Sequence, residues 1–195
     1  MSGTPATTKP FRAGMIASAL ALCLTLPSFA AELGGVTLPD QVNIDGDSLV
    51  LNGMGLRKKA IIKVYVGGLY LPAKQSDGAA ILANDSSRHM VMHFLFTVPA
   101  DRLSDAWSEG LENNTPGASA GVREAFGKLN GWMVEMKKGE QMTFSYRPGS
   151  GTTVSVKGEV KGTLKGREFA DALFACWIGK EPPSSGFKKG LLGSR

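Results

Sequence analysis

The stretch GLRKKAIIKVYVGGLYLP, residues 55–72, carries the strongest indication of how this chain folds. Its second part is rich in β-branched and aromatic residues, which is typical of a sheet strand. Alternation predicts one face made of Ile62, Val64, Val66, Gly68 and Tyr70, and an opposite face made of Ile61, Lys63, Tyr65, Gly67 and Leu69. We expect the first face to be core. The second face mixes Lys63 and Tyr65 with apolar residues, which suits the lining of a cleft or a surface covered by helices.

The first part of the stretch places a basic cluster, Arg57 to Lys59, where the chain becomes hydrophobic. One interpretation is an exposed, charged turn. The other is a site in which Arg57 and Tyr65 hold a negatively charged group, because a guanidinium pairs bidentately with a carboxylate and a phenol adds a hydrogen bond. The second interpretation requires the two side chains to converge, and a tight turn at Lys58-Lys59 would separate them. The residues alone leave both open.

Glycines in and before this stretch also need an explanation. Gly67-Gly68 indicates a bulge or a close approach of another backbone. Gly53 and Gly55 do not open a helix within a βαβ unit, so they do not fit a nucleotide-binding loop. We interpret them as turn or bulge residues.

The remaining elements follow from periodicity and from turn residues. Strands are expected at 35–39, 48–56, 60–72, 88–98, 140–149, 152–160 and 161–166, and helices near 79–84, around the stripes Leu103/Trp107/Leu111 and Val122/Phe126/Leu129/Met133, and at 167–179. The order of these elements is strands, then two helices, then strands, then a helix. This order predicts an α+β fold in which antiparallel hairpins carry helices on one face.

The N-terminal residues 1–30 have the layout of a cleavable secretory signal. Lys9 and Arg12 precede an apolar run at 13–27, and small residues surround a cleavage point after Ala30. The apolar run is shorter than the about 20 residues of a membrane-spanning helix. We therefore expect a signal peptide at 1–30, a single domain at 31–195, no transmembrane segment, and export to the periplasm.

Composition argues against several classes of function. Removal of the signal lowers the formal net charge from +5 to +3, too small an excess to indicate a nucleic-acid partner. Cys176 would be the only cysteine left, so no internal disulfide is expected. His89 and His93 share a strand face about 13 Å apart and cannot bind one metal ion together. No serine-hydrolase motif is present, and we expect neither a metal nor a cofactor.

Two sequence motifs resemble those of a known family. The segments GMGLRKK and KVYVGGLYLP, together with KGREFADALFACWIGKEPPSSGFKKGLLG near the end, resemble the bacterial branch of the chalcone isomerase-like family from about Gly35 to Gly193. The resemblance implies an open-faced β-sandwich: a large antiparallel sheet, a layer of helices on one face, and a ligand cleft between them. Plant chalcone isomerases in this family close a ring in a flavonoid precursor, whereas related fatty-acid-binding proteins hold a fatty acid without catalysis.

The resemblance also implies a set of site residues. Arg57 matches the arginine that the enzymes use on a phenolate and the binding proteins use on a carboxylate. Tyr65 falls where the enzymes have a threonine and the binding proteins a tyrosine. Leu103 and Gly110 fall where the enzymes have a helical tyrosine and asparagine, and Cys176 matches a threonine or serine. These differences favour a protein that binds and does not catalyse.

We therefore expect a periplasmic protein that binds a fatty acid or another apolar carboxylate, with Arg57 and Tyr65 at the head group. The apolar tail would lie along Leu103, Trp107 and Met92. The apolar set Met90, Met92, Phe94 and Phe96 is otherwise explained as ordinary core.

Two alternative functions remain. One is an isomerase, an intramolecular lyase acting on an enone, in which Arg57 stabilises an oxyanion. The other is a structural or partner-binding domain of the cell envelope. It would have a cleft filled by its own side chains and Arg57 turned to solvent.

Overall fold

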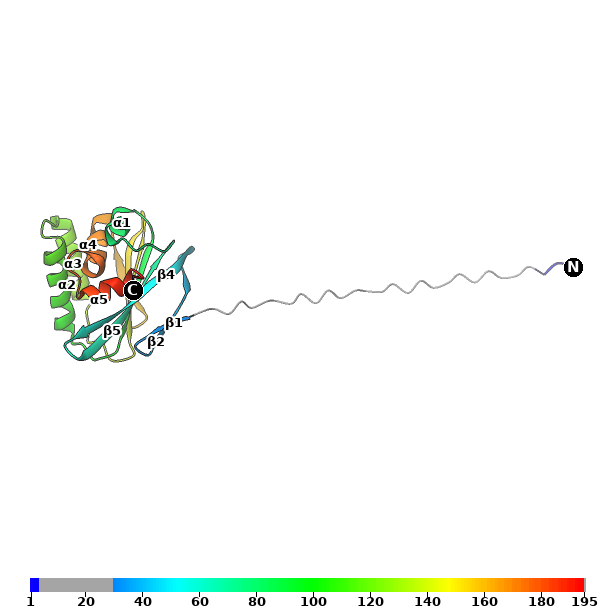
Figure 1. Cartoon of the computed structure of the whole chain (residues 1–195). Coiled ribbons are helices and arrows are strands. Elements are labelled where there is room, and N and C mark those ends of the chain that lie inside the picture. Colours follow the sequence, from blue (N-terminus) through cyan, green and yellow to red (C-terminus); the bar gives the residue numbers. More distant parts are fainter. Residues whose placement is uncertain (4–29, 195) are drawn as a thin grey trace.

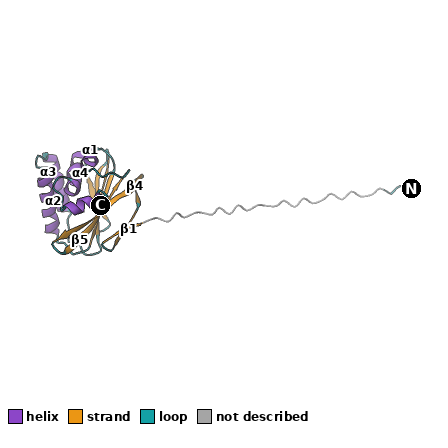
Figure 2. Cartoon of the chain, viewed as in Figure 1, coloured by secondary structure: helices purple, strands orange, loops and turns teal. Residues whose placement is uncertain are grey.

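A seven-stranded antiparallel sheet with helices on one face dominates the computed structural model, which describes residues 1–3 and 30–194 (Figure 1). The strands are β1 (Ala30–Leu33), β2 (Val36–Pro39), β3 (Gln41–Ile44), β4 (Asp47–Lys59), β5 (Ile62–Leu71), β6 (Arg88–Phe94), β7 (Gln141–Arg147), β8 (Gly151–Val156) and β9 (Glu159–Leu164). The helices are α1 (Gly78–Ala83), α2 (Ala100–Asn114), α3 (Ala120–Gly131), α4 (Arg167–Ile178) and α5 (Ser185–Leu191). The helices gather on one side of the strands (Figure 2).

The large sheet has the order β3-β4-β5-β6-β7-β8-β9, so each strand pairs with its neighbour in sequence. All of these pairings are antiparallel. Helix α1 connects β5 to β6, and α2 and α3 connect β6 to β7. The predicted α+β class and the open-faced sheet with a helical layer are confirmed.

Apolar side chains on the two faces of the sheet form separate cores. On the helical face, Trp107, Phe144 and Trp177 contact one another edge to face, with ring centroids 5.3 to 5.4 Å apart. On the opposite face, Val66 and Tyr70 of β5 pack with residues of the separate β1–β2 sheet. From Tyr65 to Leu71, both faces of β5 are therefore buried.

Helix α5 lies directly on β4, and the glycines of β4 explain how. It follows Pro182-Pro183 and begins where the Ser184 hydroxyl accepts a hydrogen bond from the Phe187 N–H (3.2 Å). A Cβ atom at Gly53 would lie 2.2 Å from the Gly190 carbonyl oxygen, and one at Gly55 would lie 2.5 Å from the Phe187 carbonyl oxygen. Neither residue lies in a turn, so that part of our interpretation is corrected, whereas the register shift between Leu51 and Gly53 agrees with a bulge at Gly53. Both glycines lie within β4, where the backbones of helix and strand approach closely.

Replacing Gly55 with alanine is expected to lower the free energy of unfolding by about 2 kcal/mol, because the added methyl group would displace α5. Gly127→Ala on the exposed side of α3 is the matched control. A Cβ there meets nothing within 4 Å, and alanine in a helix interior should stabilise by about 0.5 to 1 kcal/mol. Urea unfolding of both variants measures the two effects, and an undiminished stability of Gly55→Ala would contradict the packing of α5 on β4.

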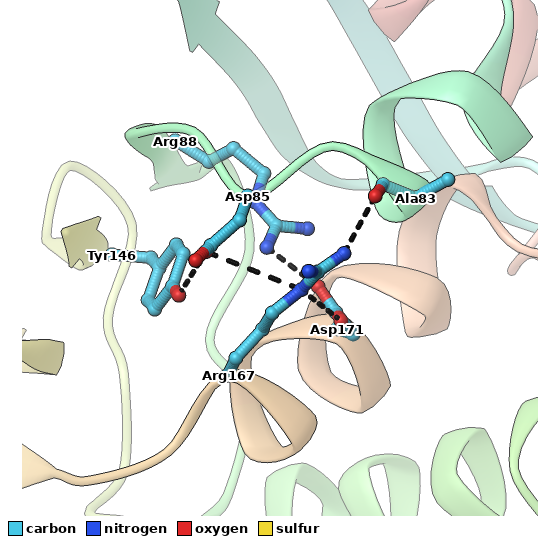
Figure 3. A network of polar contacts seen from close by, with 6 residues as sticks. All are labelled: Ala83, Asp85, Arg88, Tyr146, Arg167 and Asp171. Atoms are coloured by element: carbon cyan, nitrogen blue, oxygen red, sulfur yellow. Dashed lines mark hydrogen bonds and ion pairs between the residues drawn. The ribbon is translucent and has the colours of Figure 1, made fainter. Parts of the chain in front are cut away.

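A network of charged groups connects α1, β6, β7 and α4 (Figure 3). Arg88, the first residue of β6, is fully buried and donates to Asp171 of α4 at 2.6 Å. Arg167 contacts the same carboxylate at 3.2 Å and donates to the Ala83 carbonyl oxygen at 2.6 Å. The network joins the helical layer to the sheet.

Several elements differ from the sequence prediction. Strands β1 and β3 and helix α5 were not predicted, and strand β6 ends at Phe94, short of the predicted Val98. The predicted signal peptide falls almost wholly on residues 4–29, outside those described. Within the described residues, no helix is both long and apolar enough to cross a membrane.

Candidate ligand-binding cleft

A cleft of about 590 Å³ opens between the start of β5, the end of β6, helix α2 and the segment after α4. This volume falls within the range of about 300 to 1,000 Å³ that is usual for small-molecule sites. All six predicted site residues line it: Arg57, Tyr65, Leu103, Trp107, Gly110 and Cys176. Met92, Phe94 and Phe96 also contribute to its surface.

Arg57 and Tyr65 converge because of where the hairpin turns. The turn between β4 and β5 is made by Ala60 and Ile61, beyond Lys58-Lys59, and Arg57 pairs directly with Tyr65 in the antiparallel register. Directly opposed residues of an antiparallel pair present their side chains on the same face, with Cβ atoms about 5 Å apart. The structure brings the two predicted head-group residues together on the cleft side.

The register shifts between Arg57 and Lys58, so that Val64 is an extra residue on β5. Such a bulge interrupts the alternation of side chains. Ile62 and Val64 accordingly line the cleft together with Tyr65, while Lys63 is exposed. Our prediction that Ile62 and Val64 lie on the face opposite Tyr65 is corrected for this end of the strand.

The guanidinium of Arg57 has one hydrogen-bond partner within residues 30–194. Its Nη1 donates to the Lys58 carbonyl oxygen at 2.6 Å, and the side chain is half-buried at the rim of the cleft. A guanidinium has five N–H donors, so this single bond orients the group and leaves donors for a ligand. Arg57 is therefore a half-buried residue of the cleft wall and not merely a solvated turn residue.

Tyr65 is buried, with 8% of its surface exposed, and its ring contacts Phe94 and Phe187 at centroid distances of 5.8 and 5.4 Å. Burial raises the pKa of its hydroxyl well above the ordinary value, while the Arg57 charge and the Trp177 indole act in the opposite direction. The hydroxyl stays protonated at neutral pH. It can donate a hydrogen bond to a carboxylate but is a poor proton acceptor.

Helix α2 supplies the opposite wall through Leu103, Trp107 and Gly110, which follow a four-three spacing on one side of the helix. Gly110 permits close packing on α4, since a Cβ atom there would lie 2.8 Å from the Cys176 sulfur. Burial raises the pKa of the Cys176 thiol to about 12, and the thiol donates to the Ala172 carbonyl oxygen (3.4 Å). Gly110 and Cys176 thus form a tight wall with no free charge.

Comparisons with known proteins agree with this architecture. The model of the chalcone isomerase-like family matches residues 30–193. The chain belongs to the chalcone isomerase-like family. Among solved structures, a fatty-acid binding protein of Arabidopsis thaliana is similar with a TM-score of 0.65 and 17% sequence identity, over 84% of this chain and 96% of that one. No curated protein sequence matches the chain.

In this member of the chalcone isomerase-like family, the cleft contains residues that sequence reasoning did not place there. Trp177 follows Cys176 at the end of α4 and lines the cleft together with Tyr65. The rim carries charged groups: Lys59, Arg102, Asp105, Glu109 and Glu181. Three of these residues, Arg102, Asp105 and Glu109, belong to α2 and lie next to the predicted apolar stripe. Their spacing of three and four residues is the sequence pattern that could have identified them.

The two histidines lie outside the cleft. His89 bonds through Nδ1 to the Ser145 hydroxyl (2.8 Å), and His93 contacts the Gln141 amide (3.1 Å). Burial lowers the pKa of His89 to about 4, so its ring is neutral at pH 7. Within the part of the chain that the structure describes, no group of three or more His, Cys, Asp or Glu side chains could hold a metal ion.

Proposed function

We propose that this protein binds a fatty acid or a similar apolar carboxylate in the cleft and carries out no reaction on it. The observation that carries the proposal is the direct pairing of Arg57 with Tyr65 at one end of an apolar cleft. A guanidinium and a neutral phenol together offer a charge and hydrogen-bond donors to the two oxygens of a carboxylate. The similar Arabidopsis protein is named for fatty-acid binding, which supports the same class of ligand.

The rest of the cleft suits an aliphatic tail. Leu103 and Trp107 form one side and Met92 and Phe94 another. Thioether and aromatic side chains adapt to irregular apolar shapes. Placing the tail there would bury apolar surface, while the head stays at the rim beside Arg57, where desolvation of the charge is limited.

The residues at the remaining family positions favour binding over isomerisation. Leu103 and Gly110 have no side-chain donor, and the Cys176 thiol already donates within α4. An isomerase would need groups that stabilise developing charge on the reacting oxygen, and of these family positions only Arg57 and Tyr65 have a side-chain donor free to do so. A purely structural domain would not need a cleft of about 590 Å³ with a half-buried arginine in its wall.

We further propose that residues 1–30 direct export to the periplasm and are removed. The support is the order of basic, apolar and small residues in this segment. Cleavage after Ala30 would leave three of the four residues of β1, Ala31 to Leu33, to pair with β2.

Native mass spectrometry of the full-length gene product, purified from the periplasmic fraction of a Gram-negative host, tests both proposals. We expect an intact mass equal to residues 31–195, together with a bound species that organic extraction identifies as a fatty acid. An uncleaved chain in the cytoplasm would contradict export. A ligand-free protein that binds no added fatty acid and accelerates chalcone cyclisation would contradict the binding proposal and favour the isomerase.

A further inference from the structure

The turn between β4 and β5 exposes apolar side chains beside the cleft. Among residues 30–194, five large hydrophobic side chains are exposed, and three of them lie here: Ile61 (95%), Ile62 (42%) and Phe96 (50%). Phe96 belongs to the segment that runs beside β5, because the Leu95 N–H donates to the Val64 carbonyl oxygen at 2.8 Å. Ile62 and Phe96 both line the cleft. Single exposed apolar residues are ordinary, but a group at the edge of a binding cleft indicates an interaction surface.

The turn itself has an unusual composition. The other two-residue turns between paired strands are Gly34-Gly35, Asp45-Gly46 and Lys157-Gly158, each with glycine second. These are residues that tight hairpin turns favour. The β4–β5 turn instead uses Ala60-Ile61, and Ala60 adopts a left-handed conformation (φ 53°) that costs energy for a residue with a Cβ atom. The chain thus has an isoleucine, 95% exposed, at the turn position where these other hairpins have glycine.

The apolar residues are surrounded by positive charge. Lys58, Lys59 and Lys63 are exposed, and among the described residues none of the three takes part in an ion pair. The sequence contains no acidic residue from Ser48 to Ser76. The helix α2 side of the cleft is mixed in charge, since Arg102 there lies 3.9 Å from Asp105. Among the described residues that line the cleft, the basic side chains without an ion pair, Arg57 and Lys59, therefore belong to the hairpin.

We name residues 58–63 the hairpin tip; in Figure 1 this turn lies at the lower edge of the molecule, on the side of the helical layer. An exposed isoleucine pair flanked by lysines matches the interface of an anionic lipid bilayer. Apolar side chains enter the acyl boundary, and lysine ammonium groups stay among the phosphates. A protein partner fits less well, because a stable protein interface needs about 20 to 30 residues on each side. The hairpin tip offers far fewer.

We propose that the hairpin tip, with Ile61 and Ile62 at its apex and Lys58 and Lys63 beside them, docks the protein on the surface of an anionic lipid bilayer. Docking in this orientation presents the mouth of the cleft to the membrane, since Lys59 and Ile62 of the hairpin tip also line the cleft, as does the exposed Phe96. A ligand could then pass between bilayer and cleft without crossing open water. That last step rests on the proposed function, whereas the docking itself does not.

Flotation with lipid vesicles tests the docking. The purified protein is mixed with vesicles of phosphatidylcholine, either alone or with 30 mol% phosphatidylglycerol as the probe. We expect the partition coefficient to be at least about tenfold higher on the anionic vesicles, and to fall with rising salt. A purified protein that binds neither kind of vesicle would overturn the proposal.

Two variants at positions outside the cleft lining separate the apolar and charged contributions. Ile61→Ser is expected to reduce binding to anionic vesicles about fivefold or more, and Lys58→Gln with Lys63→Gln should remove most of the preference for phosphatidylglycerol. Val160→Ser is the matched control, because Val160 is 62% exposed on β9 and should leave binding unchanged. Equal losses in Ile61→Ser and Val160→Ser would contradict a role for the hairpin tip.

Native mass spectrometry of the same samples distinguishes failure of docking from failure of the proposed function. Ile61→Ser should keep the ligand content of the wild-type protein while losing vesicle binding. A wild-type protein that floats with vesicles but neither carries nor binds a fatty acid would leave the docking intact and refute the proposed ligand.

Discussion

Replacing Arg57 with alanine is expected to weaken the binding of dodecanoate by roughly tenfold to a hundredfold. A hydrogen bond to a charged group contributes about 1.5 to 3 kcal/mol, and about 1.4 kcal/mol corresponds to a factor of ten in affinity. The loss should be large because Arg57 is the basic residue paired directly with Tyr65 at the cleft. Isothermal titration calorimetry with the ligand-free protein measures the change.

Two comparisons make the Arg57→Ala result specific. Lys58→Ala removes the same charge from the adjacent residue, which does not line the cleft, and should change the affinity less than twofold. Dodecanol has the same tail without the carboxylate, so its affinity should be nearly the same for wild type and Arg57→Ala. If dodecanoate bound equally well to wild type and Arg57→Ala, Arg57 would not contact the head group.

The sequence was sufficient to predict most of the fold because its periodicities are strong. The stripe Leu103/Trp107/Leu111 corresponds to the buried side of α2, and the alternation around Val66 and Tyr70 corresponds to a buried strand. Helix α5 was not predicted because it is short and rich in glycine and lysine. Its position depends on contacts with Gly53 and Gly55, which are distant in sequence.

The sequence was sufficient to identify the two head-group residues of the candidate site, but not to show how they are arranged in space. Arg57 and Tyr65 were identified from residue chemistry and family resemblance, but their convergence depended on whether the turn lay at Lys58-Lys59 or beyond it. The bulge at Val64 could not be predicted from alternation, because it arises from the pairing of two strands. Trp177 reaches the cleft that Tyr65 also lines through the packing of α4 on the sheet, which no local pattern encodes.

The buried pair of Arg88 and Asp171 leads to the largest expected effect on stability. Arg88 is fully buried, and its guanidinium lies between the rings of Tyr146 and Phe174, 4.9 and 5.1 Å from their centroids. Among the residues that the structure describes, its Nε and Nη1 atoms have no hydrogen-bond partner, so the Asp171 carboxylate is the main group that compensates its charge. Removing one partner of a buried ion pair leaves an uncompensated charge, which costs more than the pair itself contributes.

Asp171→Ala is therefore expected to lower the free energy of unfolding by about 3 kcal/mol, near the lower end of the range for buried pairs because Asp171 is 30% exposed. Glu124→Ala is the matched control: it breaks the exposed Glu124–Lys128 pair, and surface pairs of this kind contribute little. Adding Arg88→Met to Asp171→Ala should recover part of the loss, since methionine fills the space between the two rings without a charge. Urea unfolding of the wild type, the two single variants and the double variant measures these free energies. A double variant less stable than Asp171→Ala alone would mean that Arg88 acts mainly through its packing and hydrogen bonds, and that the unpaired charge is not what destabilises the protein.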